Sequence, residues 1–207
     1  MNLKKFLNLI NKKTIYFFYF FLFSYGIFYA FKLGITSDAG FYINVGKDRL
    51  DYLLSFGLIN EKSHIYQLAF PAIYLTVAAF VSSFFPQSIE IQVFYIFNFT
   101  VSLFGAIGFY KLSKLLFNKE IAVYSFVFLL LFAPFFGHML INGRDTTLLA
   151  CNIWITFFSL KYFEFDLEKN KKYIIYLSVI IAVGVGVRLH FIATLIPLVL
   201  YLFYNLY

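Results

Sequence analysis

Long, almost continuously apolar runs make up most of this chain, and short polar connections separate them. A helix needs about 20 apolar residues to cross the hydrocarbon core of a bilayer. Only helices or a closed barrel satisfy their backbone groups in lipid, and continuous rather than alternating apolar runs favour helices. The segments that fit a crossing helix are Thr14–Ile35, Leu68–Phe85, Ile91–Tyr110, Ile121–Ile141, Thr146–Phe163, Tyr173–Val187 and Leu189–Tyr207.

These segments predict an all-α fold, a polytopic transmembrane helical bundle of roughly six to seven helices. The chain contains no low-complexity linker and no internal repeat, so we expect one transmembrane domain over residues 1–207. The run Thr14–Ile35 follows a basic N-terminus, is longer than the core of a signal peptide, and has no small-residue cleavage site after it. We therefore expect it to be retained as the first helix.

Composition supports a membrane protein. Hydrophobic residues make up 62% of the 207 residues and charged residues only 13%, whereas soluble domains are about half apolar and a quarter charged. The net charge of +7 is concentrated in short flanking segments, which indicates membrane topology rather than a nucleic-acid surface. The single cysteine, Cys151, excludes an internal disulfide framework.

The basic connections predict the topology. Lysines at the N-terminus, in 111–119 and in 161–172 mark cytoplasmic segments of an inner-membrane protein. Strict alternation through every candidate helix would place 111–119 outside. We therefore expect Leu68–Phe85, which contains Pro71, not to span the membrane.

A polar island between Thr36 and Gln67 interrupts the apolar pattern. Within it, the segment Lys47–Phe56 places Leu50, Leu53 and Leu54 on one helical face, with Lys47, Asp48 and Asp51 opposite. This pattern predicts an amphipathic helix on the outer membrane surface after the first transmembrane helix, and Gly57 supplies its end.

With this topology, the outer face carries Asp38, the Arg144–Asp145 pair, and Arg188 with His190. Arg188 lies in an apolar stretch, so it must mark a turn between two short helices or face a polar cavity. Arginine binds phosphate bidentately, and a carboxylate facing such a pocket can take a proton from an attacking hydroxyl.

Simpler interpretations stand beside this one. Arg144 and Asp145 can form a local ion pair in a loop, and Arg188 can reach toward the interface from a helix end. Metal-ligand spacing is absent from the sequence. A metal would need separated residues such as Asp38, Glu61, Asp145 and His190.

The order of these features resembles the GT-C class of polytopic glycosyltransferases, which includes protein O-mannosyltransferase-like and lipid A aminoarabinose transferase-like enzymes. The first matching feature is the basic N-terminus with the first helix, and the further matching segments extend along nearly the whole chain. These are Ser37-Asp38-Ala39-Gly40-Phe41-Tyr42, Leu68-Ala69-Phe70-Pro71-Ala72-Ile73-Tyr74, the basic connection Tyr110–Lys119, Phe132-Ala133-Pro134 before Gly143-Arg144-Asp145, and the glycine-rich stretch from Gly184 to His190.

The resemblance implies a hexosyl- or pentosyltransferase that moves a sugar from a polyprenyl-phosphate donor to a hydroxyl on a glycan, lipid or protein at the outer face. By resemblance, Asp38 is the general base and Asp145 a second acidic residue. Arg144 and Arg188 contact the phosphate, and His190 is a substrate-binding candidate beside them. No cofactor is named, and a divalent metal stays open.

The sequence departs from the family pattern in its first loop, which has Asp38-Ala39-Gly40 in place of paired acids, and in its single proline at Pro71. It stops inside an apolar run, so we expect the N-terminal part of a longer GT-C module; a degenerate relative without catalysis is the alternative. Two other classes stay open: a multi-pass transporter or channel lined by Arg188 and Asp145, and a non-catalytic membrane subunit.

Overall fold

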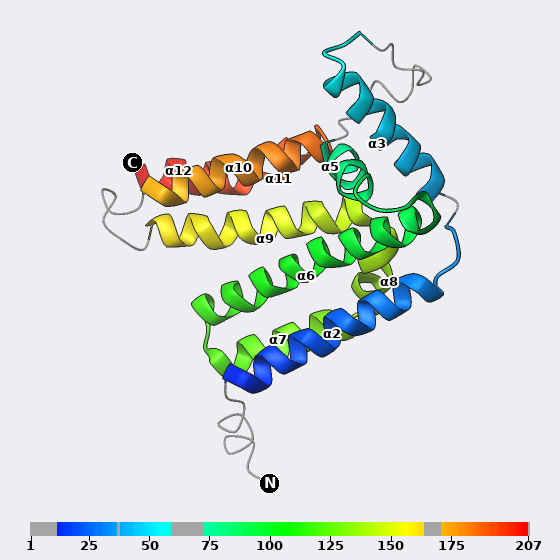
Figure 1. Ribbon diagram of the computed structural model, residues 1–207. Coiled ribbons are helices and arrows are strands. Elements are labelled where there is room, and N and C mark those ends of the chain that lie inside the picture. Colours follow the sequence, from blue (N-terminus) through cyan, green and yellow to red (C-terminus); the bar gives the residue numbers. More distant parts are fainter. Residues whose placement is uncertain (1–11, 37, 59–72, 164–170, 207) are drawn as a thin grey trace.

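The computed structural model describes residues 12–36, 38–58, 73–163 and 171–206, and these residues are helical apart from short connections and one 3-10 turn (Figure 1). The predicted all-α fold is confirmed for this part of the chain. The elements in chain order are α2 (Lys12–Lys32), α3 (Ala39–Leu54), α5 (Ile73–Ser82), η1 (Gln87–Ile89), α6 (Glu90–Leu116), α7 (Lys119–Leu131), α8 (Ala133–Ile141), α9 (Gly143–Phe163), α10 (Lys171–Val187), α11 (Phe191–Thr194) and α12 (Ile196–Leu206).

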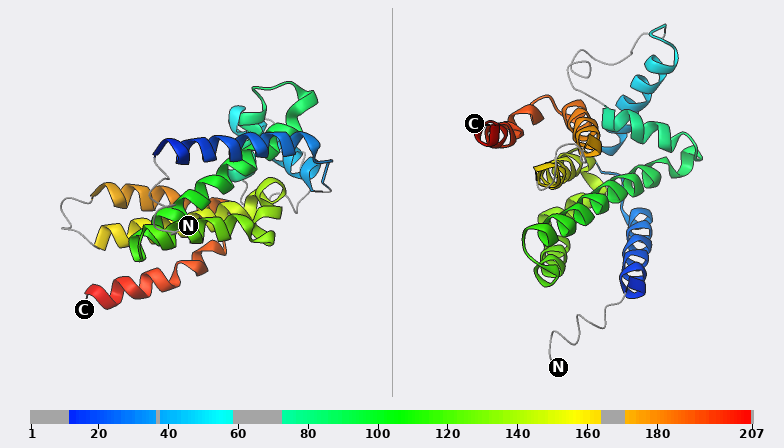
Figure 2. Two further views of the ribbon diagram at one scale, coloured as in Figure 1. Left: turned by 90° about the horizontal axis from the view of Figure 1, so that it is seen from below. Right: turned by 90° about the vertical axis from the view of Figure 1, so that its left-hand side faces the viewer.

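The long helices lie side by side and give the bundle two distinct ends (Figures 1 and 2). One end holds the start of α2, the turn between α6 and α7, the end of α9 and the end of α12. The opposite end holds α3, α5, α8, and the points where α9 begins and α10 ends. The basic connection at Lys114 and Lys119 therefore lies at the end opposite the predicted site residues.

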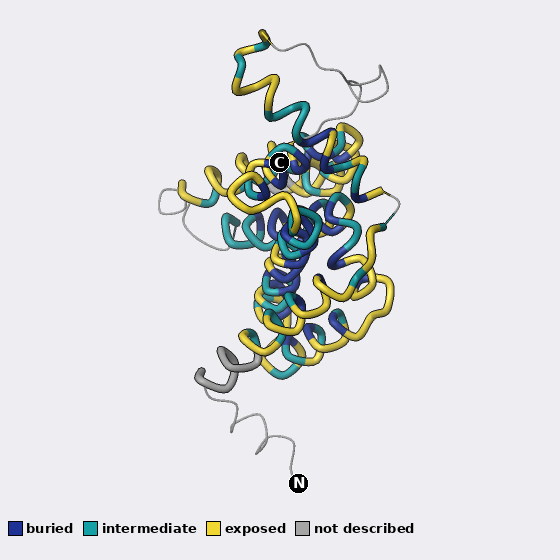
Figure 3. Tube along the Cα trace, turned by 45° about the vertical axis from the view of Figure 1, so that its right-hand side comes forward, coloured by how far each residue is buried: buried dark blue, intermediate teal, exposed yellow. Residues whose placement is uncertain are grey.

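Helix α6 is the central element of the bundle. It packs against α2, α3, α5, α7, α8 and α9, and buried positions follow it through the middle of the molecule (Figure 3). Its largest fully buried side chains are Phe94, Tyr95 and Phe99. The outer helices instead expose large apolar side chains such as Phe21 and Phe128, which is the surface expected of a bundle in contact with lipid.

Small residues let α6 and α9 approach closely. A Cβ placed on Gly105 would lie 2.9 Å from the Cβ of Ala150, and one on Gly108 would lie 2.8 Å from the Trp154 ring. The Trp154 indole nitrogen donates a hydrogen bond of 3.1 Å to the Phe104 carbonyl. Two kinds of contact thus fix the crossing of α6 and α9: the close approach at Gly105 and Gly108, and the hydrogen bond from Trp154.

The prediction of one continuous helix over Ile121–Ile141 is wrong. Helices α7 and α8 are bent by 65° at a break after Leu131. Pro134 lies in the first turn of α8; in a continuous helix it would clash with the carbonyl of Leu130 and leave that carbonyl without a donor. Proline therefore starts a new helix here.

Helix α5 lies in the described part of the predicted segment Leu68–Phe85 and ends at Ser82. Its 10 residues extend about 15 Å, half the thickness of a hydrocarbon core of about 30 Å. The predicted segment begins before Ile73, where this described stretch starts, so the expectation that it does not span the membrane stays a prediction. Residues 68–72, including Pro71, lie outside the described residues.

The amphipathic helix of the polar island is confirmed as α3, although it begins at Ala39 rather than Lys47. Its buried residues include Ala39, Ile43 and Gly46, whereas Leu53 and Leu54, on the predicted apolar face, are exposed. The helix ends before Gly57, as predicted, but the left-handed backbone begins one residue earlier: Phe56 has a φ of 54° and Gly57 a φ of 83°. The Gly57 N–H donates to the Tyr52 carbonyl and closes the helix end.

Within the described residues, the stretch Gln87–Leu116 is long and apolar enough to cross a membrane, and α7 with α8 would add a second crossing if the bent pair is one span. Other expected spans lie in shorter or broken helices: Leu189–Tyr207, for example, divides into α11 and α12. The polytopic arrangement stays a prediction.

The α6–α9 crossing predicts the cost of enlarging Gly105. Gly105→Ala places a methyl group against Ala150 and should lower the free energy of unfolding by about 1–3 kcal/mol through overpacking. Gly137→Ala is the control, because a Cβ at Gly137 meets nothing within 4 Å. Thermal unfolding of the detergent-purified variants measures the effect, and equal midpoints for the two variants would contradict the close approach.

Candidate functional site

An ion pair between Asp145 and Arg188 joins the ends of two helices. The Arg188 Nη2 lies 2.7 Å from Asp145 Oδ1, and both side chains are partly exposed. Asp145 lies in the first turn of α9, where a helix N-terminus favours a negative charge. The interpretation that Arg144 and Asp145 lie in a loop is wrong, because both residues belong to α9. The ion pair of Asp145 with Arg188 was not predicted.

Asn142 orients the carboxylate from the residue just before α9. Its side-chain amide donates a hydrogen bond of 2.8 Å to Asp145 Oδ2, and its side-chain carbonyl oxygen accepts one of 3.3 Å from the Asp145 backbone N–H. The two oxygens of Asp145 are thus held by different partners, Arg188 and Asn142. This reciprocal arrangement is a cap on the helix as well as a support for the ion pair.

Arg188 occupies the turn that its sequence context predicted. Helix α10 ends at Val187 and α11 begins at Phe191. Within α10, Gly184 leaves room for the Phe191 ring, which a Cβ at Gly184 would approach within 2.2 Å. The Nε atom of Arg188 is buried and has no hydrogen-bond partner in the described part of the chain. The guanidinium therefore keeps a donor that Asp145 does not use.

Arg144 connects this end of α9 to α3. Its guanidinium lies over the ring of Tyr42, 5.6 Å from the centroid, within the range of a cation–π contact. The Tyr42 backbone N–H donates a hydrogen bond of 2.9 Å to the carbonyl of Asp38. The side chain of Asp38 is exposed. Asp38 therefore lies one helical turn before Tyr42, the residue whose ring Arg144 contacts.

His190 does not join this network. It is exposed, directly precedes α11, and its side chain has no hydrogen bond or ion pair with the described residues. The structure thus connects Asp38, Arg144, Asp145 and Arg188 through neighbouring elements, and leaves His190 beside them as a prediction.

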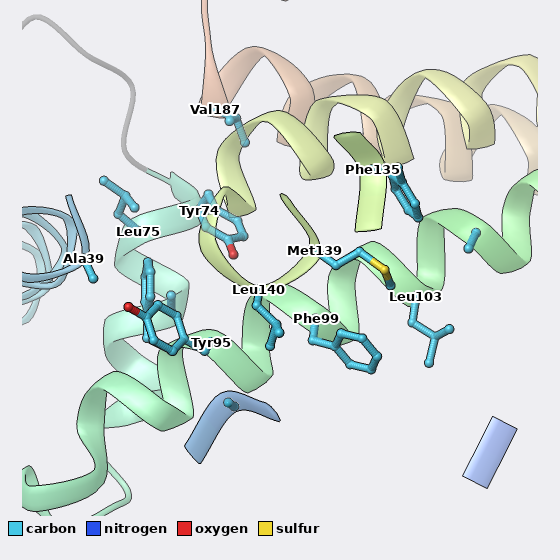
Figure 4. Close-up of a cluster of buried hydrophobic side chains, with 14 of the residues drawn as sticks. Ala39, Tyr74, Leu75, Tyr95, Phe99, Leu103, Phe135, Met139, Leu140 and Val187 are labelled. Atoms are coloured by element: carbon cyan, nitrogen blue, oxygen red, sulfur yellow. The ribbon is translucent and has the colours of Figure 1, made fainter. Parts of the chain in front are cut away.

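A buried polar network, which the sequence did not reveal, supports the start of α9. The Tyr74 hydroxyl donates to the side-chain oxygen of Asn98, and the Asn98 amide donates a hydrogen bond of 2.7 Å to the Leu140 carbonyl near the end of α8. Ser102, one turn further along α6, lies 3.2 Å from the Met139 carbonyl. Figure 4 shows Tyr74, Met139 and Leu140 within this buried region.

This network fixes the break between α8 and α9. A Cβ on Gly143 would lie 2.3 Å from the Asn98 side-chain oxygen, so only glycine fits there. Burial raises the pKa of Tyr74 well above its usual value, and the phenol stays protonated and donates. Asn98 and Ser102 stand four residues apart in an apolar helix, which was a usable signal for polar contacts between helices.

Comparison of the sequence with protein-family models identifies a family for this chain. The model of the dolichyl-phosphate-mannose-protein mannosyltransferase family matches residues 71–206. The chain belongs to this family. Membership supports a GT-C-type glycosyltransferase and agrees with the resemblance seen in the sequence.

The mannosyltransferase-family match includes Arg144, Asp145, Arg188 and His190, whereas Asp38 precedes it. No curated protein and no solved structure matches the chain in the other two comparisons. The roles of individual residues in this family member therefore rest on the geometry above.

The described residues of this mannosyltransferase-family protein contain no preformed set of metal ligands. No group of three or more His, Cys, Asp or Glu side chains in that part of the chain is placed to share a metal ion. Glu61, one of the ligands considered from the sequence, lies outside the described residues.

The buried network predicts the effect of removing Asn98. Asn98→Leu leaves the Tyr74 hydroxyl and the Leu140 carbonyl without their partner, and should lower the free energy of unfolding by about 1–3 kcal/mol. Thr100→Val is the control, because Thr100 is exposed on the same helix and bonds only the Ile96 carbonyl. Chemical denaturation of both variants in detergent checks this, and equal stabilities would show that the network does not hold the break.

Proposed function

We propose that this protein is a multi-pass inner-membrane glycosyltransferase that transfers a sugar from a polyprenyl-phosphate donor to a hydroxyl acceptor at the outer face. The Arg188–Asp145 ion pair carries the proposal, because it joins two charged clusters, Arg144–Asp145 and Arg188–His190, that lie far apart in the sequence. Family membership supports sugar transfer in general, and the donor, acceptor and membrane face are our inferences.

The charges at this end of the bundle suit a phosphate-bearing donor. Arg144 and Arg188 bring two guanidinium groups to neighbouring helix ends, and arginine binds phosphate oxygens with strong, charge-assisted hydrogen bonds. The unused Nε of Arg188 provides a further donor. Asp145 holds Arg188 in place through the ion pair, which keeps the guanidinium oriented before the donor arrives.

The proposed reaction is a single displacement at the anomeric carbon. The acceptor oxygen forms a bond to that carbon while its proton passes to the Asp38 carboxylate. The bond between the anomeric carbon and the phosphate oxygen breaks, and the lipid phosphate leaves with the electron pair. Arg144 and Arg188 stabilise the charge that develops on the leaving phosphate. One displacement inverts the configuration at the anomeric carbon.

The membrane arrangement follows from the two ends of the bundle. The end with the α6–α7 turn carries Lys114 and Lys119, and basic connections are retained in the cytoplasm. The end with α3 and the Asp145–Arg188 pair would then face outward, with α5 lying short of a full crossing. This arrangement gives a cytoplasmic N-terminus, as expected from the sequence.

Thiol labelling tests the topology. In a Cys151→Ser background, Asp51→Cys on α3 and Lys114→Cys on α6 each introduce one exposed thiol. An impermeant reagent added to intact cells should block Asp51→Cys, and should reach Lys114→Cys only after the membrane is permeabilised. Labelling of both positions from the same side would contradict the proposed outer site.

Sugar transfer by the intact gene product tests the role of Asp38. With a labelled polyprenyl-phosphate sugar as donor, Asp38→Asn should lower kcat by about 10²- to 10⁴-fold, the contribution of a general base. Asp51→Asn is the matched control and should retain activity, because Asp51 is an exposed carboxylate within α3, the helix that Asp38 precedes. Full activity in Asp38→Asn would remove the general base from the proposal, and solute flux through reconstituted vesicles without sugar transfer would favour a transporter instead.

A further inference from the structure

Tyr95 holds the backbone that leads to Asp38. Its side chain is 0% exposed, and its hydroxyl reaches the connection between α2 and α3. The Thr36 backbone N–H donates a hydrogen bond of 3.0 Å to the Tyr95 oxygen. The same oxygen lies 3.1 Å from the Gly34 carbonyl and 3.2 Å from Thr36 Oγ1, which can accept its proton.

The segment around Asp38 is anchored on both sides. Thr36, held by Tyr95, comes two residues before Asp38, and its carbonyl accepts a hydrogen bond of 3.1 Å from the Ala39 N–H. Ala39, the next residue after Asp38, is buried at 2% exposure. Figure 4 shows the Tyr95 hydroxyl directed toward Ala39. Asp38 is therefore an exposed carboxylate on a backbone whose two flanks are fixed in the core.

We infer that Tyr95 is a positioning residue that sets the location of the Asp38 carboxylate for proton transfer. The inference rests on the proposed function, in which Asp38 is the general base. A base must come within about 2.6–3.2 Å of the proton it removes, and a displacement of about 1 Å can cost on the order of 10² in rate. A connection without a fixed point would not hold a carboxylate to that tolerance, and the Tyr95 hydroxyl supplies the fixed point from the central helix.

The contacts distinguish this role from ordinary packing. The Tyr95 ring belongs to the buried cluster that also contains Phe94 and Phe99, and Tyr95→Phe would keep that ring. Only the hydroxyl reaches Gly34 and Thr36. Removing the hydroxyl therefore separates the support of Asp38 from the filling of the core.

The experiment compares wild type, Tyr95→Phe, Asp38→Asn and the double variant of the intact gene product in the polyprenyl-phosphate transfer assay. Tyr95→Phe should lower kcat by about 10- to 100-fold and leave KM for the donor unchanged, because only the position of the base changes. In the Asp38→Asn background, the same substitution should cost less than about twofold, since residues that act through one another are not additive.

Tyr110→Phe is the matched control, because it removes a hydroxyl near the other end of α6, where the ring packs on Phe126. It should leave kcat unchanged. Hydrogen exchange of the Thr36 amide supplies a readout independent of activity: the amide should exchange faster in Tyr95→Phe and not in Tyr110→Phe. If Tyr95→Phe fails to fold, Thr36→Val, which removes a half-exposed partner of the hydroxyl, should lower kcat in the same direction.

Each outcome decides the inference. Unchanged Thr36 exchange, unchanged kcat, or an equal loss with and without Asp38 would overturn the positioning role. A wild-type protein that transfers no sugar from any polyprenyl-phosphate donor would instead overturn the proposed function, and the Thr36 exchange would still show whether Tyr95 holds this segment. The two failures are thus distinguishable.

Discussion

The buried hydrogen bonds of Asn98 are the interaction on which the candidate site depends. A break between α8 and α9 leaves carbonyls at the end of α8 without helical partners, and Leu140 is buried. The Asn98 side-chain amide donates a hydrogen bond to the Leu140 carbonyl, and the Asn98 side-chain oxygen accepts one from the Tyr74 hydroxyl. This one side chain joins α5, α6 and α8, and the glycine that opens α9 fits against it. The directions of Arg144 and Asp145 follow from that junction.

The central helix α6 supports the site at separate points along its length. Tyr95 bonds the connection that precedes Asp38. Asn98 and Ser102 bond carbonyls near the end of α8, and the absence of a side chain at Gly105 allows α9 to pack closely. These residues are buried on a helix that packs against α2, α3, α5, α7, α8 and α9. A rigid central helix with polar side chains at chosen positions lets short, separate segments meet with the precision that catalysis requires.

Several features of the fold were predictable because they depend on local chemistry. Continuous apolar runs predicted helices, Gly57 predicted the end of α3, and an arginine in an apolar stretch predicted the turn after α10. The break at Phe132 was missed, because the apolar run continues across it and only Pro134 marks the new helix. The start of α3 was also missed: its buried residues are Ala39, Ile43, Val45 and Gly46, and they precede the leucines on which the prediction rested.

The sequence by itself determined the helical class and the identity of the charged candidates, because long apolar runs form helices and isolated charges stand out within them. Only the tertiary structure decided which charges meet. Asp145 pairs with Arg188 across 43 positions of sequence, and Tyr95 bonds Thr36, which lies 59 positions away and just before Asp38. Such contacts depend on how helices cross, and crossing is set by the small residues and buried polar bonds of α6.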